Sequence, residues 1–318
     1  MRVTAGLGKS SCHLRNLGIM TVIKEHKAQI VTRFAPSPSG FLHLGHVYAA
    51  LHARKVADAA GGAMRLRIDD IDHTRCKPVF KEAILEDLTW LGIAHDGPLR
   101  IQSEQLDDYQ QALASLQNRG LVYPCWLSRA ALNALLDAPH QPVQATDKLE
   151  SADRRRQHIR EGREPAWRLR INEALEEAGS LSLEDSRFGR HHLDPEDPAM
   201  AILREDVVIA RRDIGTSYHL SVVIDDAAQG VTLATRGLDL WPVAPLHRLL
   251  QQLLGLPETR FCHHPLILDS DGNRLAKRNH GLAIAQLRQQ GMSPRQVLDR
   301  LAAAKLQSTL DTCSPAGS

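Results

Sequence analysis

Cysteine is scarce in this sequence of 318 residues, and no two cysteines have the spacing of a paired site. The chain holds five, an odd number, and none belongs to a Cys-x-x-Cys motif. This pattern argues against a disulfide framework and against a zinc site of four thiolates, and it favours a reducing compartment, which we expect to be the cytoplasm. The cysteines are Cys12, Cys76, Cys125, Cys262 and Cys313.

Long apolar runs and an excess of one charge are also missing. No run approaches the ~18 apolar residues that a membrane span needs, so we expect no membrane partner. The 39 Lys and Arg residues against 37 Asp and Glu residues leave a formal net charge of +2, so a nucleic acid would have to meet a local basic patch. Hydrophobic residues make up 43% of the chain, which is enough for a sizeable core and excludes a disordered protein.

Residues 1–28 precede the first strand-like run and contain no apolar segment of the kind found in signal peptides. We expect a disordered N-terminal extension here. A dispensable tail, or a translation start at Met20, accounts for it more simply than an amphipathic transit segment.

Strand and helix patterns alternate in the next part of the chain. Apolar residues predict a strand over 29–34, a helix over 46–60, a strand over 64–68 and a helix over 80–91. This order is typical of a parallel sheet in an α/β protein. Further strands are predicted over 167–171, 207–211, 231–236 and 265–268, helices over 243–254 and 282–304, and an insertion or mobile loop over 138–165.

The turn between the first strand and the first helix carries histidines one helical turn apart. His43 and His46 flank Gly45 at the expected start of the helix. Ring N–H groups at a helix amino end favour an anion, and Gly45 leaves the backbone open to a phosphate or a flat base. Taken alone, the histidines could be half of a metal site or simply surface residues.

A group of cations lies late in the chain, on a polar loop after an apolar strand. A turn over 269–272 leads into Arg274, Lys277 and Arg278. Alone, such a group is usually solvated surface. The histidine turn and this loop, in this order along an α/β chain, are far more specific than either feature by itself.

His43-Leu44-Gly45-His46 resembles the HIGH signature of class I aminoacyl-tRNA synthetases, and the segment 274–278 resembles their KMSKS loop. The segments 33–38, 67–72, 218–226 and 235–240 are similar to glutamyl-tRNA synthetases. After the KMSKS-like loop only a short helical stretch follows, in place of anticodon-binding domains. That outline resembles the glutamyl-queuosine tRNA(Asp) synthetases, paralogues that attach glutamate to the queuosine base in the anticodon.

The resemblance implies an α/β fold. We expect a Rossmann-like class I synthetase catalytic domain with an inserted connective, acceptor-binding-like subdomain and a short C-terminal helical stub. The first half of the catalytic domain would span 29–120, the insertion 121–200, the second half 201–262, and the KMSKS-like loop with the helical stub 263–318.

The resemblance also implies the chemistry, in which a glutamate carboxylate attacks the α-phosphate of ATP and gives glutamyl-adenylate. His43, His46 and Lys277 would be catalytic, because they would stabilise charge on the transferring and leaving phosphates. Mg²⁺ is expected on the phosphates. The residues implied for ATP are His43, Gly45, His46, Arg274, Lys277 and Arg278, and those implied for L-glutamate are Arg33, Ala35, Ser37, Asp69, Tyr218 and Arg236.

The sequence departs from these relatives at some of its positions. Asp69 stands where a longer glutamate is usual, and Arg274 replaces the first lysine of the loop. Many relatives carry a Cys-x-Cys here, whereas Cys125 is followed by Trp126-Leu127 with no second cysteine nearby. We therefore predict that structural zinc is absent and that the Trp126-Leu127 pair packs in its place.

Other functions stay open at this point. The chain could be a truncated glutamyl-tRNA synthetase that charges a tRNA 3′ end, or a non-catalytic relative that binds RNA or nucleotides. The arginine-rich stretch over 154–170 is either an RNA-binding patch or a solvated helix with charges of both signs. We expect a monomer with L-glutamate, ATP and a tRNA(Asp) carrying queuosine as its partners.

Overall fold

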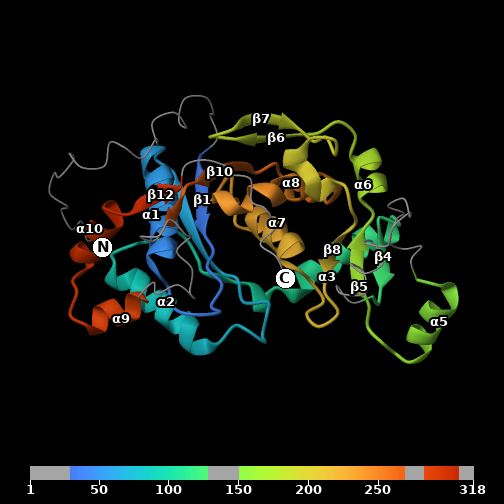
Figure 1. Ribbon diagram of the computed structural model, residues 1–318, viewed down its shortest axis with the longest axis horizontal. Helices are drawn as coiled ribbons and strands as arrows, with labels where there is room; N and C mark the ends of the chain where they lie inside the picture. Colours follow the sequence, from blue (N-terminus) through green and yellow to red (C-terminus); the bar gives the residue numbers. More distant parts are fainter. Residues whose placement is uncertain (1–28, 128–149, 269–282, 308–318) are drawn as a thin grey trace.

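The computed structural model describes residues 29–127, 150–268 and 283–307 (Figure 1). The expected extension over 1–28 and the KMSKS-like loop therefore lie outside the described residues. The helices are α1 (Leu44–Ala59), α2 (Pro78–Trp90), α3 (Leu106–Asn118), α5 (Ala152–Arg160), α6 (Ile171–Ala178), α7 (Tyr218–Ala228), α8 (Ala244–Leu253), α9 (Ile284–Gln289) and α10 (Pro294–Ala302). The strands are β1 (Val31–Phe34), β2 (Ala63–Ile68), β3 (Arg100–Ile101), β4 (Val122–Cys125), β5 (Ala166–Leu169), β6 (Ser182–Asp185), β7 (Gly189–His192), β8 (Val207–Ala210), β9 (Leu233–Gly237), β10 (Arg260–His264), β11 (Leu266–Leu268) and β12 (Lys305–Gln307).

The centre of the molecule is formed by two sheets that meet at β1 and β9. One has the strand order β1-β2-β3, and the other β7-β6-β10-β9. Thr232 N donates to the Val31 carbonyl (2.9 Å) and Val31 N donates to Thr232 Oγ1 (2.9 Å), so the sheets lie edge to edge. The pairs β1–β2, β2–β3, β9–β10 and β6–β10 are parallel, which confirms the predicted α/β sheet.

The order of strands reverses at this junction. From β1 the chain proceeds to β2 and β3 on one side, and it later returns to β9 and β10 on the other side. In open α/β sheets, ligands bind outside the carboxyl ends of the strands at such a reversal. The fold therefore predicts a binding site where β1 and β9 end.

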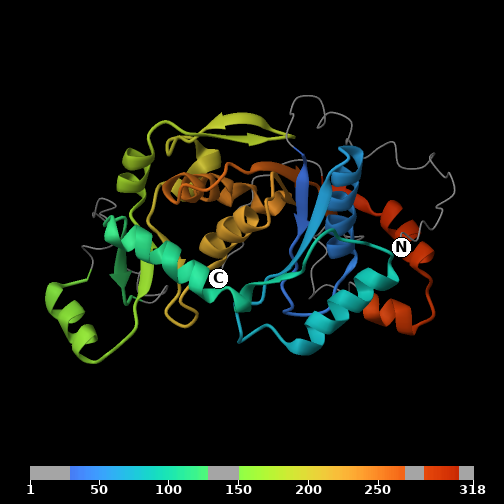
Figure 2. The same cartoon turned by 180° about the vertical axis from the view of Figure 1, so that it is seen from behind.

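Helix α1 packs against β1, β2 and β9 (Figure 1). Its buried face, which includes Val47, Ala50 and Ala53, has the spacing of a core-facing helical stripe. Helices α9 and α10 lie beside α1 and α2 (Figure 2), and they add Ile284 and Val297 to the same apolar cluster. These helices correspond to the C-terminal helical stretch predicted over 282–304.

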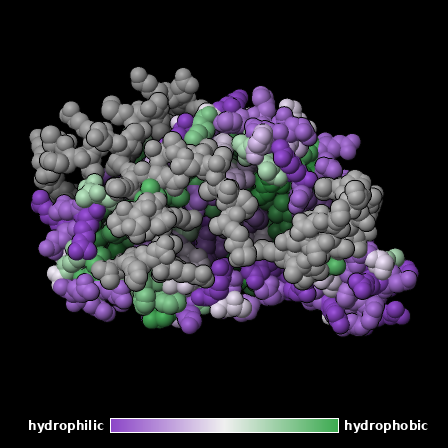
Figure 3. Space-filling model, viewed as in Figure 1, coloured by the Kyte–Doolittle hydropathy of each residue, from purple (hydrophilic) through white to green (hydrophobic). Residues whose placement is uncertain are grey.

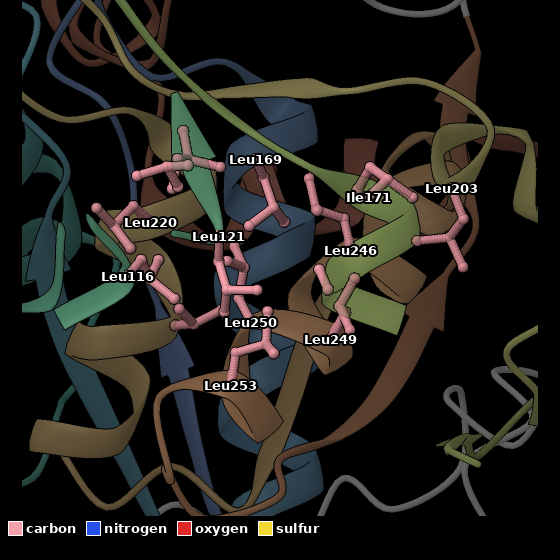
Figure 4. Close-up of a cluster of buried hydrophobic side chains, with 14 of the residues drawn as sticks. Leu116, Leu121, Leu169, Ile171, Leu203, Leu220, Leu246, Leu249, Leu250 and Leu253 are labelled. Atoms are coloured by element: carbon pink, nitrogen blue, oxygen red, sulfur yellow. The ribbon is translucent and has the colours of Figure 1, made fainter. Parts of the chain in front are cut away.

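A second core is formed by the cluster of buried apolar side chains drawn in Figure 4. Leu246, Leu249 and Leu250 of α8 pack there with side chains of α3, α6 and α7 and of an antiparallel sheet with the order β4-β5-β8. Helix α8 begins and ends within one residue of the helix predicted over 243–254. The strand predicted over 167–171 is β5, which ends earlier because Ile171 is the first residue of α6.

Trp126 is packed as predicted. It is 8% exposed, its ring stacks on His158 of α5 (ring centroids 5.4 Å apart, planes at 19°), and its Nε1 donates to the Arg163 carbonyl (2.8 Å). Among the residues that the structure describes, no group of three or more His, Cys, Asp or Glu side chains is arranged to hold a metal ion. The absence of structural zinc stays a prediction.

Helix α5 lies at one end of the molecule (Figure 1), within the region over 138–165 that we expected to be an insertion or mobile loop. No residue of α5 is buried, and Figure 3 shows hydrophilic residues over that end. Arg156 pairs with Asp153 (2.6 Å), which fits a solvated helix with charges of both signs. An RNA-binding role for α5 stays a prediction.

None of the helices in the described ranges has the length and apolar character that a bilayer crossing requires.

A buried carboxylate on α2 is expected to make stability depend on pH. The Asp87 side chain is fully buried, its carboxylate oxygens have no hydrogen-bond partner in the described part of the chain, and Arg288 Nη2 lies 3.8 Å from Oδ1. Burial raises the pKa of Asp87 from 3.8 to about 6. Because the folded protein holds this proton more tightly than the unfolded chain, the contribution of Asp87 to stability falls as pH rises from about 4 through about 6.

Replacement of Asp87 by asparagine removes the buried charge. We expect D87N to be more stable than wild type by about 1–3 kcal/mol at pH 8, and the difference to close as the pH falls below 5. Urea unfolding at pH 8 and pH 4.5 measures this, with E82Q as a control on an exposed acid of the same helix. A D87N protein that is less stable than wild type at both pH values would mean that the ion pair with Arg288 outweighs the cost of burial.

Candidate active site

A cavity of about 450 Å³ opens where β1 and β9 end and α1 begins. Every predicted site residue that the structure describes lines it. These residues are Arg33, Ala35, Ser37, His43, Gly45, His46, Asp69, Tyr218 and Arg236. The remaining predicted residues, Arg274, Lys277 and Arg278, lie outside the described residues.

The two histidines begin α1 as well as lining the cavity. His43 is the N-cap residue, and its Nδ1 accepts a hydrogen bond from Gly45 N (3.1 Å). His46 Nδ1 accepts from His43 N (3.2 Å), which completes a capping box. A neutral imidazole that accepts at Nδ1 carries its proton on Nε2. The start of the helix therefore sets both rings as Nε2–H donors at a helix amino end, where an anion is favoured.

Gly45 is required by the His43 ring. A Cβ on Gly45 would lie 2.9 Å from His43 Cε1 and 3.0 Å from His43 Nδ1, closer than such atoms approach in proteins. We expected this glycine to leave the backbone open to a base or a phosphate. In the structure its missing side chain makes room for the cap.

Two buried arginines in the lining of the cavity form ion pairs with two aspartates. Arg67 Nη1 lies 2.6 Å from Asp226 Oδ1, and Arg67 Nε lies 2.7 Å from Asp69 Oδ1. Arg33 Nε also pairs with Asp226 Oδ1 (3.2 Å). Burial raises the pKa of Asp69, against the effect of Arg67, whereas Arg33 and Arg67 overcome burial and lower the pKa of Asp226. The wall thus carries its charges in ion pairs.

Arg236 differs from these arginines because its direct partners are neutral. Its Nε donates to His263 Nε2 (2.9 Å), its Nη1 donates to His247 Nδ1 (2.8 Å), and its guanidinium carbon lies 4.5 Å from the centre of the Phe261 ring. Burial lowers the pKa of Arg236. Buried cations are normally paired, so an arginine held in this way at a cavity wall indicates a negatively charged ligand.

Tyr218 places a hydroxyl-bearing ring beside Arg236. It is the first residue of α7, whose N-cap, Ser217, accepts from Leu220 N. The Tyr218 ring meets the His247 ring edge-on, with centroids 5.5 Å apart. Tyr218 and Arg236 therefore lie close together in the lining of the cavity, and their role in binding glutamate stays a prediction.

Sequence reasoning missed the residues that support this site. Arg67 alternates with apolar residues on β2 and could pass for a solvent-facing arginine, although its side chain has no exposed surface. A charged residue in the middle of a buried parallel strand is the signal that could have revealed it. No local pattern marked His247, His263 or Asp185.

Comparison with known proteins agrees with this geometry. Residues 29–309 match the family described as "tRNA synthetases class I (E and Q), catalytic domain". The chain is 46% identical over 274 residues to the glutamyl-Q tRNA(Asp) synthetase of Rhodobacter capsulatus, an alignment that covers 84% of this chain and 98% of that protein. It is 40% identical to the enzyme of the same name from Nocardia farcinica, over 84% of this chain and 81% of the relative.

A solved glutamate tRNA ligase from Elizabethkingia meningosepticum, in complex with its amino acid, shares the fold. It superposes with a TM-score of 0.70 at 26% identity over 86% of this chain, which spans 60% of the length of that ligase. With relatives at this identity and a family match over nearly all described residues, the chain belongs to the glutamyl-Q tRNA(Asp) synthetases, ligases of the class I aminoacyl-tRNA synthetase superfamily.

Proposed function

We propose that the protein activates L-glutamate with ATP and transfers the glutamate to the queuosine base in the anticodon of tRNA(Asp). The observation that carries the proposal is one cavity that combines Nε2–H donors at a helix amino end with the buried cation of Arg236. The names of the most similar relatives support the choice of amino acid and of tRNA.

In the first step a glutamate carboxylate oxygen forms a bond to the α-phosphorus of ATP, and the bond to the pyrophosphate oxygen breaks. Negative charge builds on the phosphoryl oxygens, where His43 and His46 would donate their Nε2 protons in hydrogen bonds. Lys277, with Arg274 and Arg278, would neutralise the leaving pyrophosphate. Mg²⁺ would bind the phosphates themselves, since this ion is commonly held through substrate phosphates and retained waters.

Glutamate would lie against the wall formed by β1, β9 and α7. Arg236 and Tyr218 would hold one carboxylate, and Arg33 would add positive charge beside it. Asp69 would receive the ammonium group, while Ala35 and Ser37 would line the remaining side. A cavity wall with these cations favours glutamate over neutral glutamine.

In the second step a ring hydroxyl of the queuosine cyclopentenediol would attack the carbonyl carbon of glutamyl-adenylate, and AMP would leave with the bonding electrons. The neighbouring hydroxyls resemble a ribose diol. The proposal differs from the charging of a tRNA 3′ end in this acceptor.

Transfer of radioactive glutamate to two forms of tRNA(Asp) tests the proposal. With ATP and purified protein, we expect label on tRNA(Asp) that carries queuosine and none on an unmodified transcript with an intact 3′ end. Label on the unmodified transcript, or on a tRNA(Glu) transcript, would establish 3′ charging instead. If the protein shows no glutamate-dependent exchange between ATP and pyrophosphate, it is a non-catalytic relative.

A further inference from the structure

A line of buried side chains extends from Arg236 in two directions. On one side His263 Nδ1 lies 2.6 Å from Asp185 Oδ2 of β6, and on the other His247 Nε2 lies 3.1 Å from His219 Nδ1. Asp185, His263, Arg236 and His247 are each no more than 4% exposed. The line therefore joins the cavity wall to the edge hairpin of the sheet.

The hydrogen bonds define where each proton lies. An arginine only donates, so His263 must accept at Nε2 and His247 must accept at Nδ1. The neutral His263 ring then donates from Nδ1 to Asp185, and His247 donates from Nε2 to His219. Burial lowers the pKa of His263 and of His219 to about 4, and it lowers that of His247 as well, so the three rings are neutral at pH 7.

Neutral acceptors hold Arg236 without cancelling its charge. A carboxylate at either position would pair with the guanidinium and compete with a ligand carboxylate for it. Arg236 Nη2 is buried and has no hydrogen-bond partner of standard geometry among the residues that the structure describes. Two N–H groups are thus held by neutral imidazoles, and Arg236 keeps its positive charge in the wall of the cavity.

Asp185 is itself held in place by the hairpin. Its Oδ1 accepts from Arg187 N (2.8 Å) and Phe188 N (3.1 Å) in the turn between β6 and β7. Ser186 N donates to the Phe261 carbonyl on β10 (2.8 Å). The carboxylate that orients His263 is therefore fixed by backbone groups of an element that does not touch the cavity.

We propose that Asp185 and His263 are positioning residues that hold Arg236 as an unpaired cation and so determine the preference for glutamate over glutamine. The proposal rests on the proposed function, in which Arg236 binds a substrate carboxylate. Asp185 fixes the His263 tautomer that carries its proton on Nδ1. In the other tautomer, the Nε2–H of His263 would face the Nε–H of Arg236, and two donors cannot form a hydrogen bond.

Steady-state ATP–pyrophosphate exchange of the full chain tests the proposal. We expect H263L and D185N to raise the KM for glutamate by about tenfold to a hundredfold, because a buried donor that loses its acceptor has about this cost. The KM for ATP should stay within about threefold of wild type. The ratio of kcat/KM for glutamate over glutamine should fall by a similar factor. H263Q, whose amide oxygen can accept in place of Nε2, should recover most of the loss.

D206N is the matched control for D185N. Asp206 also accepts hydrogen bonds from a backbone N–H (Ile171, 3.0 Å) and from a side chain (Tyr123, 2.8 Å), and both of these partners lie outside the Arg236 line. We expect D206N to leave both KM values unchanged. Any one of three results would overturn the proposal. The first is that H263L and D185N raise the KM for glutamate and the KM for ATP equally, and the second is that H263Q recovers none of the loss. The third is that D206N has an effect as large as that of D185N.

Calorimetric binding of L-glutamate separates this proposal from the proposed function. A wild-type protein that binds glutamate but catalyses no exchange would contradict the function, while the weaker binding expected of D185N and H263L would still support the positioning role. Unchanged glutamate affinity in both variants would contradict the positioning role alone. Wild-type protein that binds no glutamate would contradict both.

Discussion

Replacement of His43 by serine is expected to lower kcat for ATP–pyrophosphate exchange by about 10²–10³, the effect of removing one donor from a developing oxyanion. Serine is among the best N-cap residues, so its hydroxyl can accept from Gly45 N as the imidazole does. H43S therefore removes the Nε2–H donor and keeps the start of α1. Circular dichroism and thermal unfolding should be close to those of wild type.

H43A separates the two roles of the residue. It should lose the same activity as H43S, and it should also lose about 1 kcal/mol of stability because alanine cannot cap the helix. If H43S exchanges at the wild-type rate, the imidazole has no part in the reaction and serves only as a cap. If H43S is as unstable as H43A, the drop in activity would not be evidence for catalysis.

Replacement of Arg67 by methionine is expected to destabilise the protein by about 3–5 kcal/mol, because it leaves buried carboxylates without their shared cation. Arg67 has no exposed surface and lies within 2.7 Å of both Asp69 and Asp226 and 3.6 Å from Asp225. These carboxylates overcome the effect of burial and raise the pKa of Arg67. Urea unfolding at pH 7.5 measures the loss, and poor recovery of soluble protein is an expected consequence.

R65M is the control on the same strand. Arg65 donates to the backbone carbonyls of Asp96 (3.0 Å) and Gln229 (3.3 Å), so its removal takes no hydrogen-bond donor away from a carboxylate. We expect R65M to cost less than half as much stability as R67M. An R67M protein within about 1 kcal/mol of wild type would show that the aspartates around it take up protons instead of remaining as buried anions.

The parts of the fold that follow from local pattern could be predicted from the sequence. The alternation of strand and helix gave the parallel sheet, and the apolar periodicity gave α1, α2 and α8. The hairpin of β6 and β7 was missed because only Leu183 and Asp185 on it are buried, so no apolar run marks either strand. Strand β1 is also four residues long, but all four of its residues are buried.

The candidate site was predicted in part for a related reason. Arg33, Tyr218 and Arg236 were implied by three separate segments that resemble the family, and the structure brings them to one cavity. Asp185 and His263 are 78 residues apart and interact only through folded side chains, so no spacing could reveal them. The capping role of His43 was also missed, because histidine is not among the residues expected at a helix N-cap.

The contact between Ile284 and Leu42 affects the order in which the protein can fold. Ile284 N, at the start of α9, donates to the carbonyl of Leu42 (2.8 Å), the residue before His43. The partners are 242 positions apart, from 284 − 42, and the neighbouring junction of β1 with β9 joins residues 201 apart. Contacts of such long range form late, because a large loop must close first. During synthesis on the ribosome the turn that carries both histidines therefore lacks this hydrogen bond until translation has passed residue 284.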